Sequence, residues 1–343
     1  MTTPPKVSVV IPVHNGQDYV GQTIESILSQ TFRDFELLLL DDASSDGSPA
    51  IMEGYTDRRI RLVRYDTNLG IAKMHNKGID LARGEYIAML DHDDVSYPER
   101  LARQVAFLEA HPDYALIGTW GELLDERGRR YGKAKKYPVS AEDVRSSLLF
   151  WNCVLHPSIM ARRTVMEAYR YSERFFICDD FDLCVRVGAA HKLGNLPQVL
   201  VAHRRHAART SNTKAHLKRG ENLDIFRRQL TELGVTFDER DVERHYTLAR
   251  IKTLAFRPDQ EYVEWAEGWL RKLEEANRRS SHYPTRPLAR VLGSMWFKVC
   301  WHASATAGWS VWGRFFRSPM RKGAWASLGE QLMWACGANR RAA

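Results

Sequence analysis

Cysteine is scarce, and the few cysteines are not spaced as structural or metal-binding pairs. The chain of 343 residues has five, an odd number, and no Cys-x-x-Cys pair occurs. A disulfide framework and a zinc site built from thiolates are therefore not expected. This usage is typical of a reducing compartment, and we expect the protein to work in the cytoplasm.

Long uncharged apolar stretches are absent as well. No run of about 20 residues lacks charged side chains, so a conventional transmembrane helix is not expected. The opening segment, MTTPPKVSVV, passes directly into a strand-like pattern without the hydrophobic region of a signal peptide. The formal net charge of +8 favours anionic partners, such as phosphates, nucleic acid or an acidic membrane surface, without choosing among them.

The first half of the chain alternates between strand-like and helix-like patterns. Apolar runs occupy residues 6–13, 35–42, 59–65, 85–90 and 114–120, and helical patterns lie at 18–30, 71–82 and 98–109. This alternation predicts an α/β fold in which helices cover a mostly parallel sheet. In such sheets ligands bind beyond the carboxyl ends of the strands. Later apolar segments, up to about residue 206, are expected to join the same core.

The remainder of the chain has a helical pattern. Helices are predicted at residues 217–233, 239–255 and 259–276. We therefore divide the chain into an α/β domain, residues 1–213, and a helical C-terminal region, residues 214–343.

No acidic residue occurs between Glu275 and Glu330. This stretch instead carries basic and aromatic side chains: Arg278, Arg279, Arg286, Arg290, Lys298, Arg314, Arg317, Arg321 and Lys322, with Trp296, Phe297, Trp301, Trp309, Trp312, Phe315, Phe316 and Trp325. One interpretation is a set of helices at the interface of an anionic membrane, peripheral on its cytoplasmic face. The other is a helical pair packed on the domain or on a second subunit. The mixture with Trp is unlike a plain Lys/Arg arm, so nucleic acid is not an expected partner.

Three aspartates, Asp91, Asp93 and Asp94, follow the apolar run that ends at residue 90. Like charges at one strand end persist together if a divalent cation neutralises them. Mg²⁺ or Mn²⁺ typically takes one or two carboxylates and completes its shell with substrate phosphate oxygens. The alternative is a solvated acidic turn in which Asp94 or Ser96 caps the next helix.

Several motifs in order give a more specific signal. The segments from Val7 to Gly118, then HPSIMARR, CDDFDLCVRV and RRHAARTS, resemble the family 2 glycosyltransferases with the GT-A fold. The resemblance covers roughly the first 210 residues.

For the donor, the resemblance implies the following roles. The first loop, with Pro12, Val13 and Asn15, would cradle the nucleotide, Asp42 would bind the base, and Lys73 and Asn76 would lie near base and phosphates. Asp93 would be the direct ligand of Mn²⁺ or Mg²⁺, Asp91 would contact ribose or metal, and His206 would be a third ligand or a diphosphate contact. His75 stands where the family usually has Arg. By themselves, Asp42 could be an ordinary strand-end residue and His206 a surface residue.

For the acceptor, the resemblance places the catalytic base in CDDFDLCVR. Asp180 matches the base, Asp179 replaces the usual Glu, and Arg186 matches a downstream position. Without the other motifs, these acids would be an ordinary first turn of a helix, favoured by its dipole. Trp151 and His156 are candidate acceptor-side residues, for which core packing is the alternative.

The expected reaction is inverting transfer of a sugar from a nucleotide-diphosphate donor, with UDP favoured by Asp42, to a hydroxyl of a glycan or lipid-linked acceptor. Such transfer suits polysaccharide biosynthesis in the cell envelope. A non-catalytic nucleotide-sugar or carbohydrate-binding protein on the same fold, and a sugar nucleotidyltransferase, are the alternatives. The nucleotidyltransferase usually begins with a Gly-rich basic loop, which PVHNGQDYVG is not.

Overall fold

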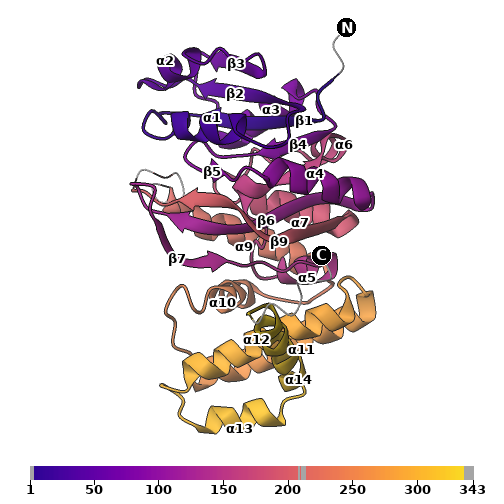
Figure 1. Cartoon of the computed structure of the whole chain (residues 1–343). Coiled ribbons are helices and arrows are strands. Elements are labelled where there is room, and N and C mark those ends of the chain that lie inside the picture. Colours follow the sequence, from indigo (N-terminus) through magenta and orange to yellow (C-terminus); the bar gives the residue numbers. More distant parts are fainter. Residues whose placement is uncertain (1–3, 208, 210–213, 336–343) are drawn as a thin grey trace. The chain divides into compact units, whose positions relative to one another are not determined.

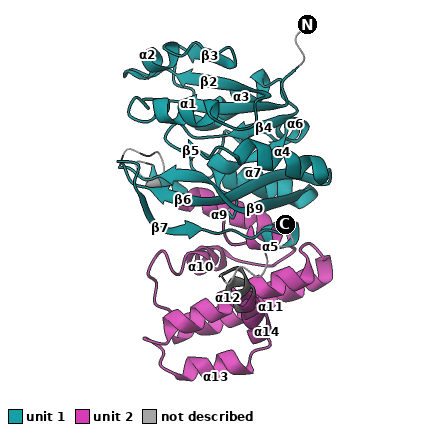
Figure 2. Ribbon diagram, in the orientation of Figure 1, with its two compact units in different colours: residues 1–144, 152–218 teal, residues 145–151, 219–343 magenta. Residues whose placement is uncertain are grey.

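The computed structural model describes residues 4–207, 209 and 214–335 (Figure 1). It divides into two compact units, residues 1–144 with 152–218 and residues 145–151 with 219–343 (Figure 2). Within the described ranges, every helix is too short or too polar to cross a membrane.

The first unit is a mixed α/β unit whose helices flank a nine-stranded sheet (Figure 1). Its strands are β1 (Val7–Val13), β2 (Phe35–Asp42), β3 (Ile60–Tyr65), β4 (Tyr86–Met89), β5 (Val95–Ser96), β6 (Tyr114–Leu124), β7 (Arg130–Lys135), β8 (Met160–Arg162) and β9 (Lys192–Arg204). Its helices are α1 (Val20–Leu28), α2 (Ser48–Glu53), α3 (Ile71–Leu81), α4 (Arg100–Ala110), the short η1 (His156–Ser158), α6 (Arg163–Tyr169) and α7 (Asp179–Ala190), while α5 (Ala141–Ser147) runs from the first unit into the second.

The strand order is β3-β2-β1-β4-β8-β6-β9-β5, with β7 paired to β6. The pairs β3–β2, β2–β1, β1–β4 and β6–β9 are parallel, whereas β8 is antiparallel to both β4 and β6. Strands β3, β2, β1, β4, β6 and β9 therefore run in one direction, which confirms the predicted mostly parallel α/β sheet. Their carboxyl ends lie at one edge, where the polar segments after β1, β2, β4 and β9 meet.

The core explains why β1 and β2 lack alternating polar positions. Every residue of both strands is buried, as expected of strands covered on both faces. Helix α3 packs closely on β1, because a Cβ added at Gly78 would lie 2.3 Å from Val10 Cγ1. This close approach fixes the helix that carries His75 and Asn76.

The second unit is helical. It contains most of α9 (Ala215–Glu232), then α10 (Glu239–Ala249), α11 (Gln260–Ser280), α12 (Thr285–Ala303), α13 (Ser310–Arg317) and α14 (Arg321–Ala335). The helix predicted to reach residue 255 ends at Ala249. The following segment turns, with Ala255 at a φ of +49°, a left-handed conformation that does not continue a right-handed helix.

Helices α12 and α14 cross at a pair of glycines. A Cβ at Gly323 would lie 2.0 Å from Ala289 O, and one at Gly293 would lie 2.3 Å from Ala324 N. Trp296 of α12 is fully buried, so part of the basic, aromatic stretch forms a helical core. Other aromatic side chains there, Trp301, Trp309, Phe316 and Trp325, are exposed.

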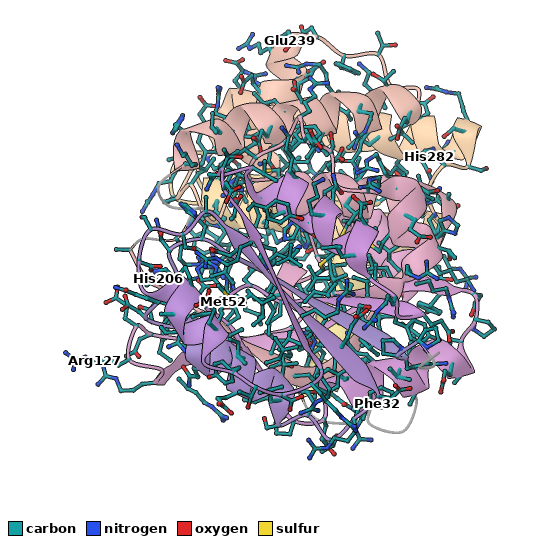
Figure 3. The ribbon with its side chains drawn as sticks, turned by 90° about the horizontal axis from the view of Figure 1, so that it is seen from above. Phe32, Met52, Arg127, His206, Glu239 and His282 are labelled. Atoms are coloured by element: carbon teal, nitrogen blue, oxygen red, sulfur yellow. The ribbon has the colours of Figure 1, made fainter. Side chains whose placement is uncertain are left out.

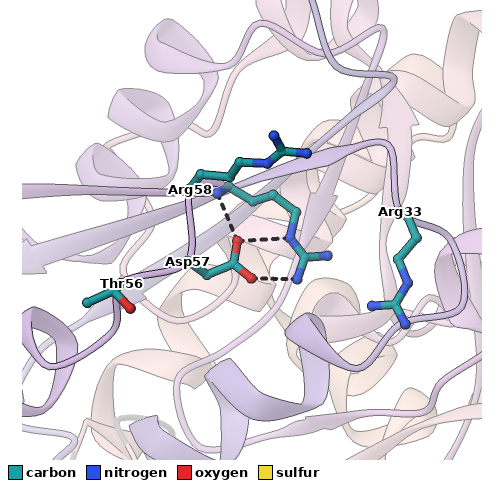
Figure 4. Close-up of a pocket in the computed structure, with 5 residues that line it drawn as sticks. Arg33, Thr56, Asp57 and Arg58 are labelled. Carbon is teal, nitrogen blue, oxygen red and sulfur yellow. Dashed lines mark hydrogen bonds and ion pairs between the residues drawn. The ribbon is translucent and has the colours of Figure 1, made fainter.

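A surface hollow of about 580 Å³ lies at the loops that precede β2 and β3 (Figure 4). It is lined by Arg33, Thr56, Asp57, Arg58 and Arg59, which precede β2 and β3 and so mark the amino ends of these strands. Arg59 donates to both oxygens of Asp57, at 3.0 and 2.7 Å. The hollow is thus at the sheet edge opposite the predicted site.

Candidate active site

The loops after β1 and β2 are hydrogen-bonded to each other. Asn15 N–H donates to Ser44 Oγ at 3.0 Å, and Ser45 N–H donates to Asn15 Oδ1 at 2.8 Å. Asn15 itself has a φ of +51°, a left-handed conformation that asparagine tolerates better than most residues. Pro12 and Val13 are buried at the end of β1 directly before this loop. The predicted nucleotide cradle is therefore an ordered double loop.

Asp42 holds the next loop by its backbone. Its Oδ1 accepts from Leu69 N–H at 2.6 Å and its Oδ2 from Gly70 N–H at 3.0 Å. Gly70 has a φ of +85° and directly precedes α3. The carboxylate thus positions the start of α3, and its contact with a nucleotide base remains a prediction.

Lys73 and Asn76 of α3 differ in environment. Lys73 is exposed, with Nζ 3.9 Å from Glu173 Oε2. Asn76 is buried and bonds the backbone of Tyr171 twice, donating to its O and accepting from its N–H, each at 2.9 Å. Asn76 therefore ties α3 to the segment before α7, and its predicted nucleotide contact stays untested.

The three aspartates after β4 each offer an oxygen within 4.8 Å of the others. Asp94 is fully buried, and its carboxylate accepts from Arg204 N–H at 2.8 Å and lies 2.9 Å from His203 Nδ1. The alternative that Asp94 or Ser96 caps the next helix is wrong, because α4 follows Glu99 and has no side-chain cap. Asp94 instead fixes the aspartate loop to β9.

Asp93 faces His206, which follows β9 and is labelled in Figure 3. His206 Nε2 lies 2.8 Å from Asp93 Oδ2, and Arg204 Nε donates to Asp93 O at 2.9 Å. Burial works to raise the pKa of Asp93, but the contact with His206 brings it below its ordinary value. Asp93 is therefore held as a carboxylate, the form that a metal ligand requires.

The donor set of this edge fits a hard divalent cation. Asp91 and Asp93 supply carboxylate oxygens, the ligands that Mg²⁺ and Mn²⁺ prefer. Both oxygens of Asp94 are already engaged by β9. Asp91 and Asp93 are thus the residues that would hold the ion.

His156 of η1 connects Asp91 with Tyr171. Its Nδ1 lies 3.3 Å from Asp91 Oδ1 and its Nε2 lies 3.0 Å from the Tyr171 hydroxyl. Burial works to lower the pKa of His156, but Asp91 and, more weakly, Asp180 and Asp179 raise it to about 9. His156 was predicted on the acceptor side, whereas Tyr171 lies in no motif and was not predicted.

Asp180 lies in the first turn of α7. Its Oδ1 accepts from Phe181 N–H at 2.7 Å, and its Oδ2 accepts from Asn152 Nδ2 at 2.9 Å. Burial, reinforced by the charge of Asp179, raises the pKa of Asp180 to about 6, against the opposing effect of His156. A carboxylate with a raised pKa that is still ionised at neutral pH suits a general base.

The other predicted acceptor residues lie as follows. Asp179 is buried, with Oδ2 3.4 Å from His75 Nδ1. Arg186 donates to Asp182 Oδ2 and Arg170 O, each at 2.7 Å, and so holds α7 to the end of α6. Trp151 belongs to the second unit, where Lys298 Nζ lies 5.1 Å from its ring centre. Their roles toward an acceptor stay predictions.

The sequence profile described as Glycosyl transferase family 2 matches residues 8–169. The chain is 30% identical over 205 residues to the uncharacterized glycosyltransferase MJ1057 of Methanocaldococcus jannaschii, covering 58% of this chain and 71% of that protein. It is 31% identical over 221 residues to the uncharacterized glycosyltransferase RP339 of Rickettsia prowazekii, covering 61% of this chain and 67% of that protein.

The chain belongs to the family 2 glycosyltransferases.

Solved structures agree with this assignment in fold. Residues 1–349 of TarS from S. aureus, in complex with UDP-GlcNAc, superpose with a TM-score of 0.57 at 17% identity, covering 87% of this chain and 89% of that one. The GT-A fold predicted from the sequence of this glycosyltransferase is thereby confirmed. The match says nothing by itself about its donor.

Substitution of Asp94 should destabilise this glycosyltransferase. Asp94→Ala leaves the buried His203 ring and Arg204 N–H without their acceptor, which should lower the free energy of unfolding by about 3 kcal/mol. Urea denaturation measures the change. The control is Asp113→Ala, whose carboxylate pairs with Lys192 at the surface and should show no measurable loss. Equal midpoints for the two variants would contradict the role of Asp94.

Proposed function

We propose that this glycosyltransferase catalyses inverting transfer of a sugar from a nucleotide-diphosphate donor to an acceptor hydroxyl. The observation that carries the proposal is the position of His156: its Nδ1 lies 3.3 Å from Asp91 Oδ1, and its ring lies 4.7 Å from that of His75, which contacts Asp179 beside Asp180. It links the oxygen ligands suited to a diphosphate-bound cation with a base suited to an acceptor. Neither group would need the other in a protein that only binds carbohydrate.

The reaction is a single displacement at the anomeric carbon. Asp180 takes the proton of the acceptor hydroxyl while the new glycosidic bond forms and the bond to the diphosphate breaks. Asn152 holds the Asp180 carboxylate in place by its amide. Asp91 and Asp93 would hold a Mn²⁺ or Mg²⁺ ion, which would supply charge stabilisation for the leaving diphosphate. One displacement inverts the configuration of the transferred sugar.

A UDP-sugar is the donor that we favour. The fold is shared with TarS, which was solved with UDP-GlcNAc, and Asp42 matches the family position for a base contact. The acceptor would be a hydroxyl of a glycan or lipid-linked glycan of the cell envelope. A non-catalytic binding protein remains the second candidate and predicts donor binding without turnover.

The second unit supports an association with the cytoplasmic face of an anionic membrane. Trp309 and Trp301 are 81% and 61% exposed, and Phe316 and Trp325 are exposed on the neighbouring helices. Arg317 and Lys322 are exposed beside them, and no acidic residue occurs in residues 276–329. Exposed Trp and Phe with Lys and Arg match the headgroup region of an anionic bilayer. Such binding would bring the enzyme to a lipid-linked acceptor.

Turnover should depend on Asp93 and Asp180. We expect the wild type to release UDP from a UDP-sugar when Mn²⁺ or Mg²⁺ is present, with water as the acceptor. Comparison with dTDP- and GDP-sugars identifies the donor. Asp93→Ala should abolish release, Asp180→Asn should lower it about 10²- to 10⁴-fold, and Asp113→Asn should leave it unchanged. Calorimetry measures donor binding by the wild type. If the donor binds but no nucleoside diphosphate is released from any donor with any acceptor glycan tried, the non-catalytic binding protein is favoured.

Turnover should also fall at acid pH. Because Asp180 acts as a base and burial raises its pKa to about 6, protonation below that pH removes the active form. As far as Asp180 controls it, the rate should be constant above pH 7. Below the pKa of Asp180 the rate should fall about tenfold for each pH unit. The pH dependence of kcat/KM measures this, with protein stability checked at each pH. A rate that stays level well below the pKa would contradict Asp180 as the base.

Membrane binding should depend on the exposed tryptophans. Flotation should recover the wild type with vesicles of phosphatidylcholine and phosphatidylglycerol, recover less with phosphatidylcholine alone, and decline as salt screens the charges. Trp301→Ser with Trp309→Ser should abolish recovery, whereas Tyr131→Ser, which alters an exposed aromatic of β7, should not. If vesicles bind neither protein and gel filtration shows a dimer that the tryptophan variant lacks, the surface contacts a second subunit instead.

A further inference from the structure

A second group of metal-binding side chains overlaps the aspartate cluster. His75 of α3, His156 of η1 and Asp91 after β4 each place one ligand atom within 4.8 Å of the other two. Asp91 lies 16 positions after His75 and 65 positions before His156, so the fold rather than a local motif brings the three together. The rings of His75 and His156 lie 4.7 Å apart at an angle of 46°.

His75 has a polar ring in a buried place. Its side chain is 2% exposed; Nδ1 has only a long contact of 3.4 Å with Asp179, and within the described ranges Nε2 has no hydrogen-bond partner. A buried polar group without a partner is costly, so a native protein normally satisfies it with a ligand, a water or an ion. The empty hydrogen-bonding capacity of His75 therefore points to a bound group.

The surroundings favour an ion. Asp179 Oδ2 is also buried, and its contact within the described residues is the one with His75 Nδ1 at 3.4 Å. A carboxylate next to one nitrogen of a histidine is the usual arrangement that orients the other nitrogen toward a metal. Likewise, the Tyr171 hydroxyl lies 3.0 Å from His156 Nε2, while His156 Nδ1 faces Asp91.

We propose that His75, His156 and Asp91 form a binding site for a late first-row divalent metal, Zn²⁺ being the reference ion. Two imidazole nitrogens and one carboxylate are a ligand set for Zn²⁺ or Co²⁺, whereas Mg²⁺ takes oxygen ligands. The site is distinct in chemistry from the oxygen site of Asp91 and Asp93, but it uses the same Asp91. An ion on the two histidines therefore competes for a carboxylate that the donor-bound cation needs, and Zn²⁺ inhibits transfer. Only this inhibition rests on the proposed function.

Co²⁺ absorption tests the site without turnover. Four- or five-coordinate Co²⁺ with nitrogen ligands absorbs much more strongly in the visible range than octahedral Co²⁺ with oxygen ligands. We expect the wild type to give the strong band and His75→Phe and His156→Asn to lose it. Asp93→Asn, which alters only the oxygen site, and His111→Phe, which alters an exposed histidine, should retain it.

The affinities should be graded. Titration should show Co²⁺ binding weakened more than about 100-fold by His75→Phe, and about 10- to 100-fold by Asp179→Ala, which removes only the orienting carboxylate. Circular dichroism and thermal unfolding establish that each variant folds, and His156→Asn serves if His75→Phe does not. A band that survives both histidine substitutions, or a wild type with only the weak octahedral spectrum, would overturn the proposal.

Inhibition is a separate measurement. Zn²⁺ should slow Mg²⁺-supported release of UDP in the wild type, and His156→Asn should lose this sensitivity when each protein is compared with its own rate without Zn²⁺. If neither the wild type nor any variant turns over any donor, the proposed function is wrong. The Co²⁺ result still shows whether the metal site exists. Equal sensitivity of the wild type and His156→Asn would overturn the competition for Asp91.

Discussion

Repulsion among the three carboxylates after β4 is the constraint on which the candidate site depends. The carboxylate of each aspartate contacts a different histidine ring. Asp91 contacts His156, Asp93 contacts His206 and Asp94 contacts His203. His203 lies in β9, His206 follows β9 and His156 belongs to η1. The loop can therefore be ordered before any cation binds, because each carboxylate has a polar partner that the rest of the fold delivers.

This requirement accounts for the path of the chain after β6. Strand β8 runs antiparallel between β4 and β6, and η1 just before it places His156 beside Asp91. Strand β9 runs parallel to β6, so its carboxyl end reaches the same edge as β4 and carries His203 to Asp94. The sheet thus needs both its parallel strands and its one internal reversed strand to complete the site.

The sequence was informative where the signal is local. Val- and Ile-rich runs predicted β1 and β2 because strands buried on both faces lack polar alternation, and the order of motifs singled out Asp93 and Asp180. The resemblance also named His206, which contacts Asp93, but other partners could not be found in this way. His203 and Asp94 are 109 positions apart and Asn152 and Asp180 are 28 apart, and no spacing rule connects residues that only the sheet topology brings together. The alternative in which Asp94 or Ser96 caps a helix has the same origin, since capping is the local use of such residues.

The two departures from the family pattern contact each other and act on the base. His75 replaces the usual Arg, Asp179 replaces the usual Glu, and Nδ1 and Oδ2 of this pair are 3.4 Å apart. An arginine stays charged at any physiological pH, whereas burial lowers the pKa of His75 below its ordinary value. The charge of Asp179 is then balanced less completely than it would be by arginine. Asp179 is, after burial, the main cause that raises the pKa of Asp180 to about 6. Histidine in place of arginine therefore favours a higher proton affinity of Asp180, which is the property that its proposed role as a base requires.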